Sequence, residues 1–173
     1  NQSELEEYLY GRVKPVIEGW TDPETWAISF FVYSNECNVY GGRDNVTEFS
    51  VGFVTEKDIQ TPYFDETERW NLPLYLGGAN TSPILRPNNV DPAVPVRVDE
   101  GMEFLFDWYA RNGIEDIGYE SAEDVYDEDA NYIGKGPVGY WEVLSAASNV
   151  GRRLQEEGVV QAAFGKPLPI IVH

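Results

Sequence analysis

Apolar side chains near the N-terminus recur at the three- and four-residue spacing of one helix face. The positions are Leu5, Tyr8, Leu9, Val13, Val16 and Ile17. The pattern predicts an amphipathic helix that begins at Ser3, because the serine hydroxyl can accept hydrogen bonds from free backbone amides and the acids that follow favour the positive end of the helix dipole. Pro15 falls inside this pattern. A proline inside a helix loses a hydrogen bond and clashes one turn back, so we expect the helix to kink or end near Lys14.

Two later segments have the pattern of β-strands. Residues 26–33 (WAISFFVY) are rich in aromatic and β-branched side chains, and residues 49–55 (FSVGFVT) place Phe49, Val51 and Phe53 on one face with a period of two. The stretch between them contains asparagine, aspartate and the pair Gly41-Gly42, which are typical of turns. The sequence therefore predicts an antiparallel hairpin with a long, irregular connection.

Residues 57–97 have no clear period. Prolines interrupt them at Pro62, Pro73, Pro83, Pro87, Pro92 and Pro95. Several large apolar residues there, among them Trp70 and Leu74, nevertheless need burial, and so long a stretch without secondary structure is uncommon in a compact domain. We expect a short strand near residues 72–76, wrapped by ordered loops.

Helical spacing returns twice in the last part of the chain. A helix is predicted from Asp99, as its cap, to Asn112, with Gly113 as its stop and one face made of Met102, Leu105, Phe106 and Tyr109. A second is predicted over residues 139–157, with Gly158 as its stop and one face made of Val143, Leu144, Ala147, Val150 and Leu154. We expect both faces to pack into one core against the sheet.

The chain closes on residues 167–172 (PLPIIV), which read as a last strand, and Pro169 favours a sheet edge or a strand start. A length of 173 residues fits one domain, and neither an internal repeat nor an interdomain linker is visible. We predict an α+β fold for residues 1–173, a single globular domain whose antiparallel or mixed β-sheet has its helices packed on one face.

The balance of charge narrows the range of partners. The chain has 30 acids against 12 bases, a formal net charge of −18. Such a charge repels phosphate backbones and anionic lipids and attracts positively charged proteins, so we expect no direct binding to nucleic acid or membranes. We also expect neither a signal peptide nor a membrane span, because no basic leader and no run of about 18 apolar residues occurs. The one cysteine, Cys37, cannot form an internal disulfide, which favours a cytoplasmic location.

Side chains that usually carry nucleophilic or metal chemistry are scarce. His173 is the one histidine and the last residue, where we expect a frayed end rather than a catalytic or zinc-bound ring. Cys37 has no histidine near it in the sequence to activate its thiol. Residues 127–131 carry the alternating acids of a calcium loop, but Tyr132 stands where that loop needs glycine and Val138 where it needs glutamate. We therefore predict no catalytic residue, no bound metal and no cofactor.

The negative charge is concentrated in one stretch. Residues 99–129 contain twelve acids and one base, whereas residues 130–173 contain three acids and four bases. Apolar residues such as Ile117 and Tyr126 alternate with the acids of the second half, and this mixture is typical of a surface for a basic partner, since charges steer and aromatic side chains anchor. A solvated face, or adaptation to high salt, is the alternative. The predicted contact residues are Glu115, Asp116, Tyr119, Glu120, Glu123, Asp124, Tyr126, Asp127, Glu128 and Asp129.

Four features occur in a particular order: an acidic N-terminal helix, the hairpin WAISFFVY and FSVGFVT, the tryptophan-containing middle around Arg69-Trp70-Asn71, and the closing segments LQEEGVV and PLPIIV. In this order the chain resembles small bacterial immunity-type proteins that neutralise secreted toxins. The resemblance implies a non-catalytic immunity or inhibitor protein that binds a basic toxin or nuclease. The alternative is a carboxylate-dependent enzyme, either glycoside hydrolase-like or dependent on a divalent metal, since paired carboxylates can carry such chemistry without histidine or cysteine.

Overall fold

The computed structural model describes residues 1–35, 46–59, 80–86, 100–118, 126–131, 133–134 and 136–173. The helices are α1 (Gln2–Glu18), the 3-10 helix η1 (Glu56–Ile59), α2 (Glu100–Arg111), α3 (Tyr140–Glu156) and α4 (Val159–Phe164). The strands are β1 (Thr25–Asn35), β2 (Val46–Thr55), β3 (Thr81–Leu85) and β4 (Ile170–Val172). The predicted strand at residues 72–76, Cys37 and the cap Asp99 lie outside the described residues.

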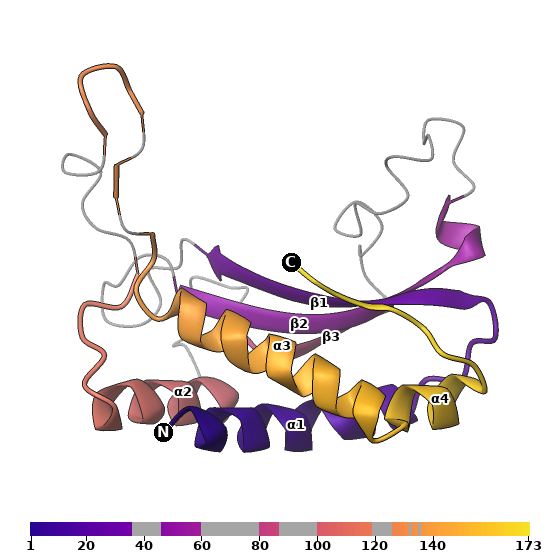
Figure 1. The fold of residues 1–173 in the computed structure, drawn as a ribbon. Coiled ribbons are helices and arrows are strands. Elements are labelled where there is room, and N and C mark those ends of the chain that lie inside the picture. The colour runs from indigo at the N-terminus through magenta and orange to yellow at the C-terminus, as the bar shows by residue number, and fades with distance from the viewer. Residues whose placement is uncertain (36–45, 60–79, 87–99, 119–125, 132, 135) are drawn as a thin grey trace, which may run out of the picture.

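The strands form one mixed sheet in the order β3-β2-β1-β4. β1 and β2 form the predicted antiparallel hairpin, with Phe30 opposite Val51 and Val32 opposite Phe49. β3 pairs antiparallel with β2, and β4 pairs parallel with β1 at the opposite edge. Helices α1 to α4 lie on one side of this sheet (Figure 1). The predicted α+β fold, a single domain with helices packed on one face of the sheet, is therefore confirmed.

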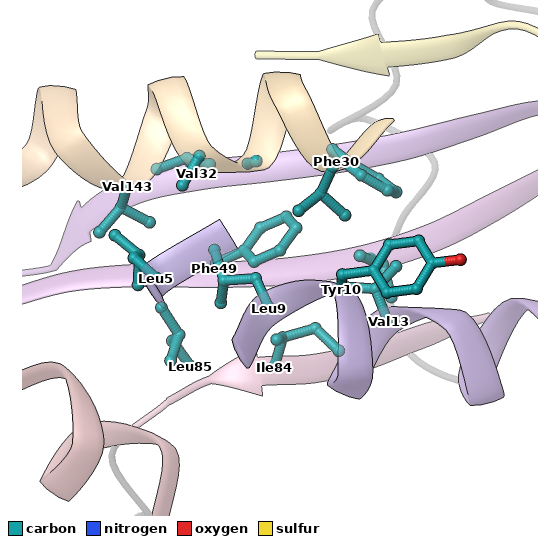
Figure 2. Packing of buried hydrophobic residues seen from close by; sticks show 14 of the residues in the cluster. Leu5, Leu9, Tyr10, Val13, Phe30, Val32, Phe49, Ile84, Leu85 and Val143 are labelled. Carbon is teal, nitrogen blue, oxygen red and sulfur yellow. The ribbon is translucent and has the colours of Figure 1, made fainter. Parts of the chain in front are cut away.

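The core lies between the helices and this face of the sheet, as Figure 2 shows for α1, α3 and the strands. Its completely buried members include Leu5, Leu9, Val13 and Ile17 from α1, Phe30 and Phe49 from the hairpin, Met102 and Leu105 from α2, and Val143 and Leu154 from α3. Burial of one such side chain contributes roughly 1.5–3 kcal/mol. The two predicted helix faces thus pack into one core. Two of the predicted residues, Phe106 and Leu144, are only partly buried, whereas Trp108 and Ala146, which were not among them, are buried.

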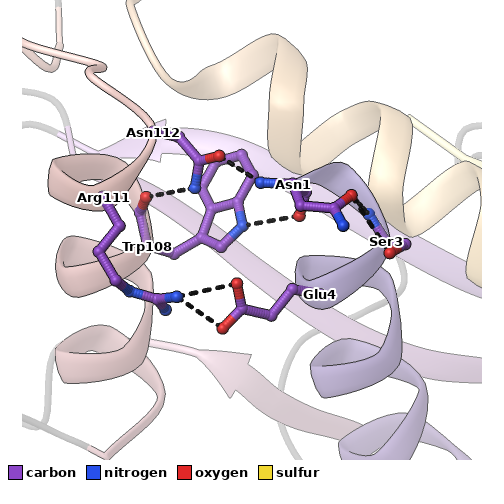
Figure 3. Close-up of polar contacts among 6 residues, drawn as sticks. All are labelled: Asn1, Ser3, Glu4, Trp108, Arg111 and Asn112. Carbon is purple, nitrogen blue, oxygen red and sulfur yellow. Dashed lines mark hydrogen bonds and ion pairs between the residues drawn. The ribbon is translucent and has the colours of Figure 1, made fainter.

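The start of α1 differs from the prediction. Asn1, not Ser3, caps the helix: its side-chain oxygen accepts a hydrogen bond from the Ser3 amide at 3.2 Å. The Asn1 carbonyl also accepts a bond from the indole nitrogen of Trp108 at 3.1 Å, and Arg111 donates two bonds to Glu4 (Figure 3). The beginning of α1 is therefore tied to the end of α2.

The prediction that α1 kinks or ends near Lys14 is wrong, because the helix continues through Pro15 to Glu18. Pro15 is exposed, so its ring meets solvent rather than the core. Val13 and Ile17 on either side of it are completely buried. The burial of these two side chains holds the last turn in place and outweighs the hydrogen bond that the proline cannot make.

The last strand begins at Ile170, directly after Pro169, and occupies a sheet edge as Pro169 suggests. Gly151 lets α3 lie close to this edge, because a Cβ there would be 3.3 Å from Ile170 and 3.5 Å from the Phe30 ring. β3 and α4 were not predicted. β3 contains Pro83. A strand tolerates proline at the sheet edge, because an edge strand has one neighbour in the sheet and needs no amide hydrogen bond to a second.

Candidate protein-binding surface

The segment that links α2 to α3, residues 112–139, is anchored at both ends; we call it the α2–α3 connection. At its start the Ile114 amide donates to the Tyr109 carbonyl at 3.0 Å, and Ile117 is buried. Gly118 and Val138 then exchange two backbone hydrogen bonds, of 3.0 and 2.8 Å, which join the outgoing and returning parts of the chain. The connection therefore leaves the helix layer from a fixed base.

Tyr109 fixes the return of the chain into α3. Its hydroxyl donates to the Gly139 carbonyl at 2.9 Å, and burial raises the pKa of this hydroxyl well above its ordinary value. Gly139 has a φ of +88°, and a Cβ on it would lie 2.8 Å from the tyrosine ring. Only glycine fits both the backbone conformation and the space, so the entry into α3 is set by this pair.

Glu115 and Asp116 lie at the base of the connection and are exposed. Ile114 on one side is half-buried and Ile117 on the other is buried, so the apolar neighbours hold the backbone while both carboxylates face solvent. Asp116 has a φ of +52°, a conformation that aspartate and asparagine adopt more readily than most residues. The two acids thus have a defined position on the surface.

Residues 126–131 form a turn that stands out from the body of the molecule (Figure 1). The Asp127 carboxylate accepts hydrogen bonds from the Asp129 amide at 3.0 Å, the Asn131 amide at 2.8 Å and the Asn131 side chain. The bonds from Asn131 are the main reason that the pKa of Asp127 is lowered. Glu128 and Asp129 at the tip are exposed. Asp127 therefore orders the turn, while its two neighbours present charge.

Exposed apolar side chains accompany these acids. Among the described residues the large exposed hydrophobic side chains are Tyr126, Ile133 and Trp141, which are 53%, 61% and 56% exposed. Tyr126 and Ile133 belong to the α2–α3 connection, and Trp141 lies in the first turn of α3 that follows it. The Trp141 ring packs edge-on against Tyr140, with 5.1 Å between ring centroids. Large apolar groups held in water are typical anchors of protein interfaces.

The predicted contact residues fall into two groups. Glu115, Asp116, Tyr126, Asp127, Glu128 and Asp129 are all exposed, and Tyr119, Glu120, Glu123 and Asp124 lie outside the described residues. Ile133 and Trp141 were missed by the sequence prediction. The position of Trp141 gave a usable signal, because it lies off the helical stripe that begins at Val143. The ion pairs within the described part of the chain join bases to Glu4, Glu7, Glu18, Glu24 and Glu157, all outside the connection.

The opposite face of the sheet carries a second polar cluster. The Tyr33 hydroxyl donates a hydrogen bond to the buried carboxylate of Glu48, and burial together with this bond raises the pKa of Tyr33 to about 12. Ser29 Oγ lies 2.7 Å from His173 Nε2. A serine and a histidine at this distance could form a nucleophile and its base, but Ser29 is completely buried and cannot reach a substrate in this conformation. The expectation of a frayed end at His173 is wrong, because its backbone bonds to β1.

Metal binding and glycoside hydrolysis both need carboxylates or other ligands held close together. Within the described ranges no group of three or more histidine, cysteine, aspartate or glutamate side chains could hold a metal ion. The calcium-like stretch at residues 127–131 instead turns the Asp127 carboxylate toward its own backbone amides. Of the carboxylates in this part of the chain, Glu48 is the buried one, and Tyr33 binds it. A glycosidase-like pair would need a second carboxylate facing it.

None of the helices in the described ranges is both long and apolar enough to cross a membrane. Comparison of the chain with protein-family models, with curated proteins and with solved structures gives no match.

Proposed function

We propose that this chain is a non-catalytic, cytoplasmic protein-binding module, an immunity or inhibitor protein that binds a basic toxin or nuclease. The observation that supports the proposal is the coincidence of exposed acids and exposed apolar side chains in the α2–α3 connection and the turn of α3 that follows it. Glu115, Asp116, Glu128 and Asp129 supply negative charge, and Tyr126, Ile133 and Trp141 supply apolar contacts. The charge of the whole chain, −18, adds a long-range attraction for a cationic partner.

The charged and the apolar side chains of this surface should affect binding in different ways. Exposed carboxylates raise the association rate of a basic partner and give little affinity once salt screens them. A large apolar side chain that leaves water at an interface lowers the dissociation rate, because its burial is lost when the complex opens. A basic protein that also presents apolar or guanidinium groups therefore fits this surface best.

The anchoring of the connection adds to this proposal. The Gly118–Val138 bonds, the Tyr109–Gly139 bond and the Asp127 turn restrict the described parts of the surface before any partner binds. A surface that is ordered in advance loses less conformational entropy on binding. We therefore expect little backbone change in residues 114–118 and 126–131 when the complex forms.

The surface can be tested by neutralising its charge without touching its scaffold. The site variant carries Glu115→Gln, Asp116→Asn, Glu128→Gln and Asp129→Asn; it spares Asp127, because that carboxylate orders the turn. The control variant carries Glu18→Gln, Glu103→Gln, Asp107→Asn and Glu156→Gln, which are exposed acids on the helices. Both remove four negative charges, so they differ in where the charge is lost and not in how much.

The measurement is stopped-flow association with a synthetic peptide rich in arginine and tyrosine, at low and at high salt. The site variant should associate about tenfold more slowly than the parent at low salt and should lose most of its salt dependence, while the control variant stays within about twofold of the parent. Equal slowing of both variants would show that only the total charge matters and that this surface has no special role.

The immunity assignment needs a biological readout. The product of the reading frame immediately upstream is expressed alone and together with this chain, and growth is followed. We expect growth arrest by that product, relief by the parent chain and the control variant, and little relief by the site variant. A product that is harmless, or one that the site variant neutralises as well as the parent does, would contradict the assignment.

A further inference from the structure

β4 pairs in parallel with residues 28–30 of β1 over its three residues, and three further backbone bonds extend this pairing at its ends. The Ile28 amide donates to the Pro169 carbonyl at 2.9 Å, the His173 amide donates to the Phe30 carbonyl at 3.0 Å, and the Val32 amide donates to the His173 carbonyl at 2.9 Å. Two of these three bonds are made by His173. Because the strand has only three residues and lies at a sheet edge, any further contact of His173 with β1 adds to its attachment.

The imidazole of His173 supplies the additional attachment. Its Nε2 atom lies 2.7 Å from the hydroxyl oxygen of Ser29, which is completely buried in β1. Its ring stacks on Phe31, with 5.0 Å between centroids and 28° between planes. Phe31 in turn stacks on Tyr33 at 4.6 Å. The side chain therefore contacts β1 through one hydrogen bond and one aromatic face, on the side of the sheet away from the helices.

The surroundings favour the neutral ring. Ser29 and Phe31 carry no charge, Tyr33 is neutral below its pKa of about 12, and β4 itself contributes only Ile170, Ile171 and Val172. The described charged groups near this cluster are Glu48, whose carboxylate accepts a hydrogen bond from Tyr33, and Arg86, whose positive charge also acts on Tyr33. An imidazolium in this place would lose hydration without gaining an ion pair from these residues.

We propose that the side chain of His173 makes the attachment of β4 to β1 sensitive to pH. The neutral imidazole stabilises the pairing of the two strands, and protonation of the imidazole weakens it. Burial lowers the pKa of the folded His173 below its ordinary value of 6.5. The imidazole of His173 therefore binds a proton more tightly when β4 is detached from β1 than when it is attached, so acid favours detachment. The stabilisation by the neutral imidazole is fully present above pH 6.5 and is lost as the pH falls from there through the lower pKa of the folded state. Release would uncover the edge of β1 and the Phe31 ring.

The test is favoured by the presence of one histidine in the chain, which gives a single, unambiguous imidazole signal in NMR. We expect this signal to titrate with a pKa below 6.5. Amide exchange supplies the second readout: the amides of Ile28 and Val32 donate to the carbonyls of Pro169 and His173 on either side of β4, and their protection factors should fall between pH 7.5 and pH 5. At most, these protection factors fall about tenfold for each unit by which the pKa of His173 is lowered in the folded state. The alternate amides of β1, which point toward β2, should keep their protection.

Two variants separate titration from packing. His173→Gln keeps a hydrogen-bonding side chain near Ser29 but cannot be protonated, so its Ile28 and Val32 protection factors should not change with pH. Ser29→Ala removes the hydroxyl and should lower protection at every pH while the imidazole still titrates. The proposal is wrong if His173 titrates at or above pH 6.5, or if the His173→Gln variant shows the same pH dependence as the parent.

Discussion

Gly139 and Tyr109 together decide how the α2–α3 connection enters α3. The glycine has a φ of +88°, and its missing Cβ leaves room for the tyrosine ring, whose hydroxyl bonds to the Gly139 carbonyl. Gly113, at the other end of the connection, also has a positive φ, +68°, but nothing lies within 4 Å of its missing Cβ. The two glycines therefore share a backbone constraint and differ in steric constraint.

Gly139→Ala should lower the free energy of unfolding by roughly 2–5 kcal/mol, because it combines backbone strain with overpacking against Tyr109. Gly113→Ala should lower it by only about 1–2 kcal/mol, since this alanine would strain the backbone but would contact no neighbouring atom. Urea unfolding at neutral pH measures both. Equal costs for the two alanines would show that the contact between Gly139 and Tyr109 is not tight.

The Asp127 carboxylate should show its role in the pH dependence of its own turn. Hydrogen bonds from Asn131 and Asp129 favour the charged form and lower the pKa of Asp127 below 3.8. A lowered carboxyl pKa means that the turn is stabilised at pH values above 3.8 and that this stabilisation is lost as the pH falls through the pKa of the folded turn. The amide signals of Asp129 and Asn131 should then shift with one midpoint below 3.8. A midpoint at 3.8 or above would contradict the bonding described for the turn.

Among the secondary-structure elements, α1 shows most clearly how packing can override an unfavourable local residue. Pro15 is exposed within the helix, and the buried side chains of Val13 and Ile17 keep the turn around it helical. Pro15→Ala should restore a backbone hydrogen bond without removing any buried contact. We expect the free energy of unfolding to rise by about 1–3 kcal/mol.

Lys14→Ala is the control for this change, because Lys14 is adjacent and partly exposed. It forms a long ion pair with Glu18, at 3.9 Å, and its ammonium lies 5.6 Å from the centre of the Tyr10 ring. Its replacement should alter stability by no more than about 1 kcal/mol. Thermal and urea unfolding of the three proteins give the comparison. If Pro15→Ala leaves the protein unchanged or less stable, the proline fits the helix at no cost and our account of α1 is incorrect.

Elements with a strong period were predictable from the sequence, and those without one were not. The stripes of α1, α2 and α3 and the alternation in β2 follow from burial on one face, so pattern alone located them. β3 was missed because Pro83 reads as a break in isolation, and only its place at the sheet edge makes it acceptable. α4 was missed because six residues are too few to show a helical period. The parallel pairing of β4 depends on contacts far apart in sequence.

At the scale of the whole molecule, the sequence predicted where the acidic surface lies but not its complete make-up. Counting charges pointed to residues 115–129, and the described acids of this stretch, Glu115, Asp116, Asp127, Glu128 and Asp129, are all exposed. It could not separate Asp127, which bonds to its own turn, from Glu128 and Asp129, which face solvent. The exposure of Ile133 and Trp141 was not predicted, because it depends on how the α2–α3 connection returns to α3. The role of His173 required the sheet, which brings Ser29 and Phe31 to it.

The central claim is that a basic partner binds at the described parts of the α2–α3 connection and at the start of α3. The most direct measurement is NMR mapping of the parent chain as the peptide rich in arginine and tyrosine is added at low salt. We predict that the largest shifts occur at the amides of Asp116, Glu128 and Asp129 and at the indole of Trp141, with small shifts along α1 and the outer face of α3. Shifts of equal size at all exposed acids, or the largest shifts on α1 with residues 126–131 unchanged, would contradict the claim.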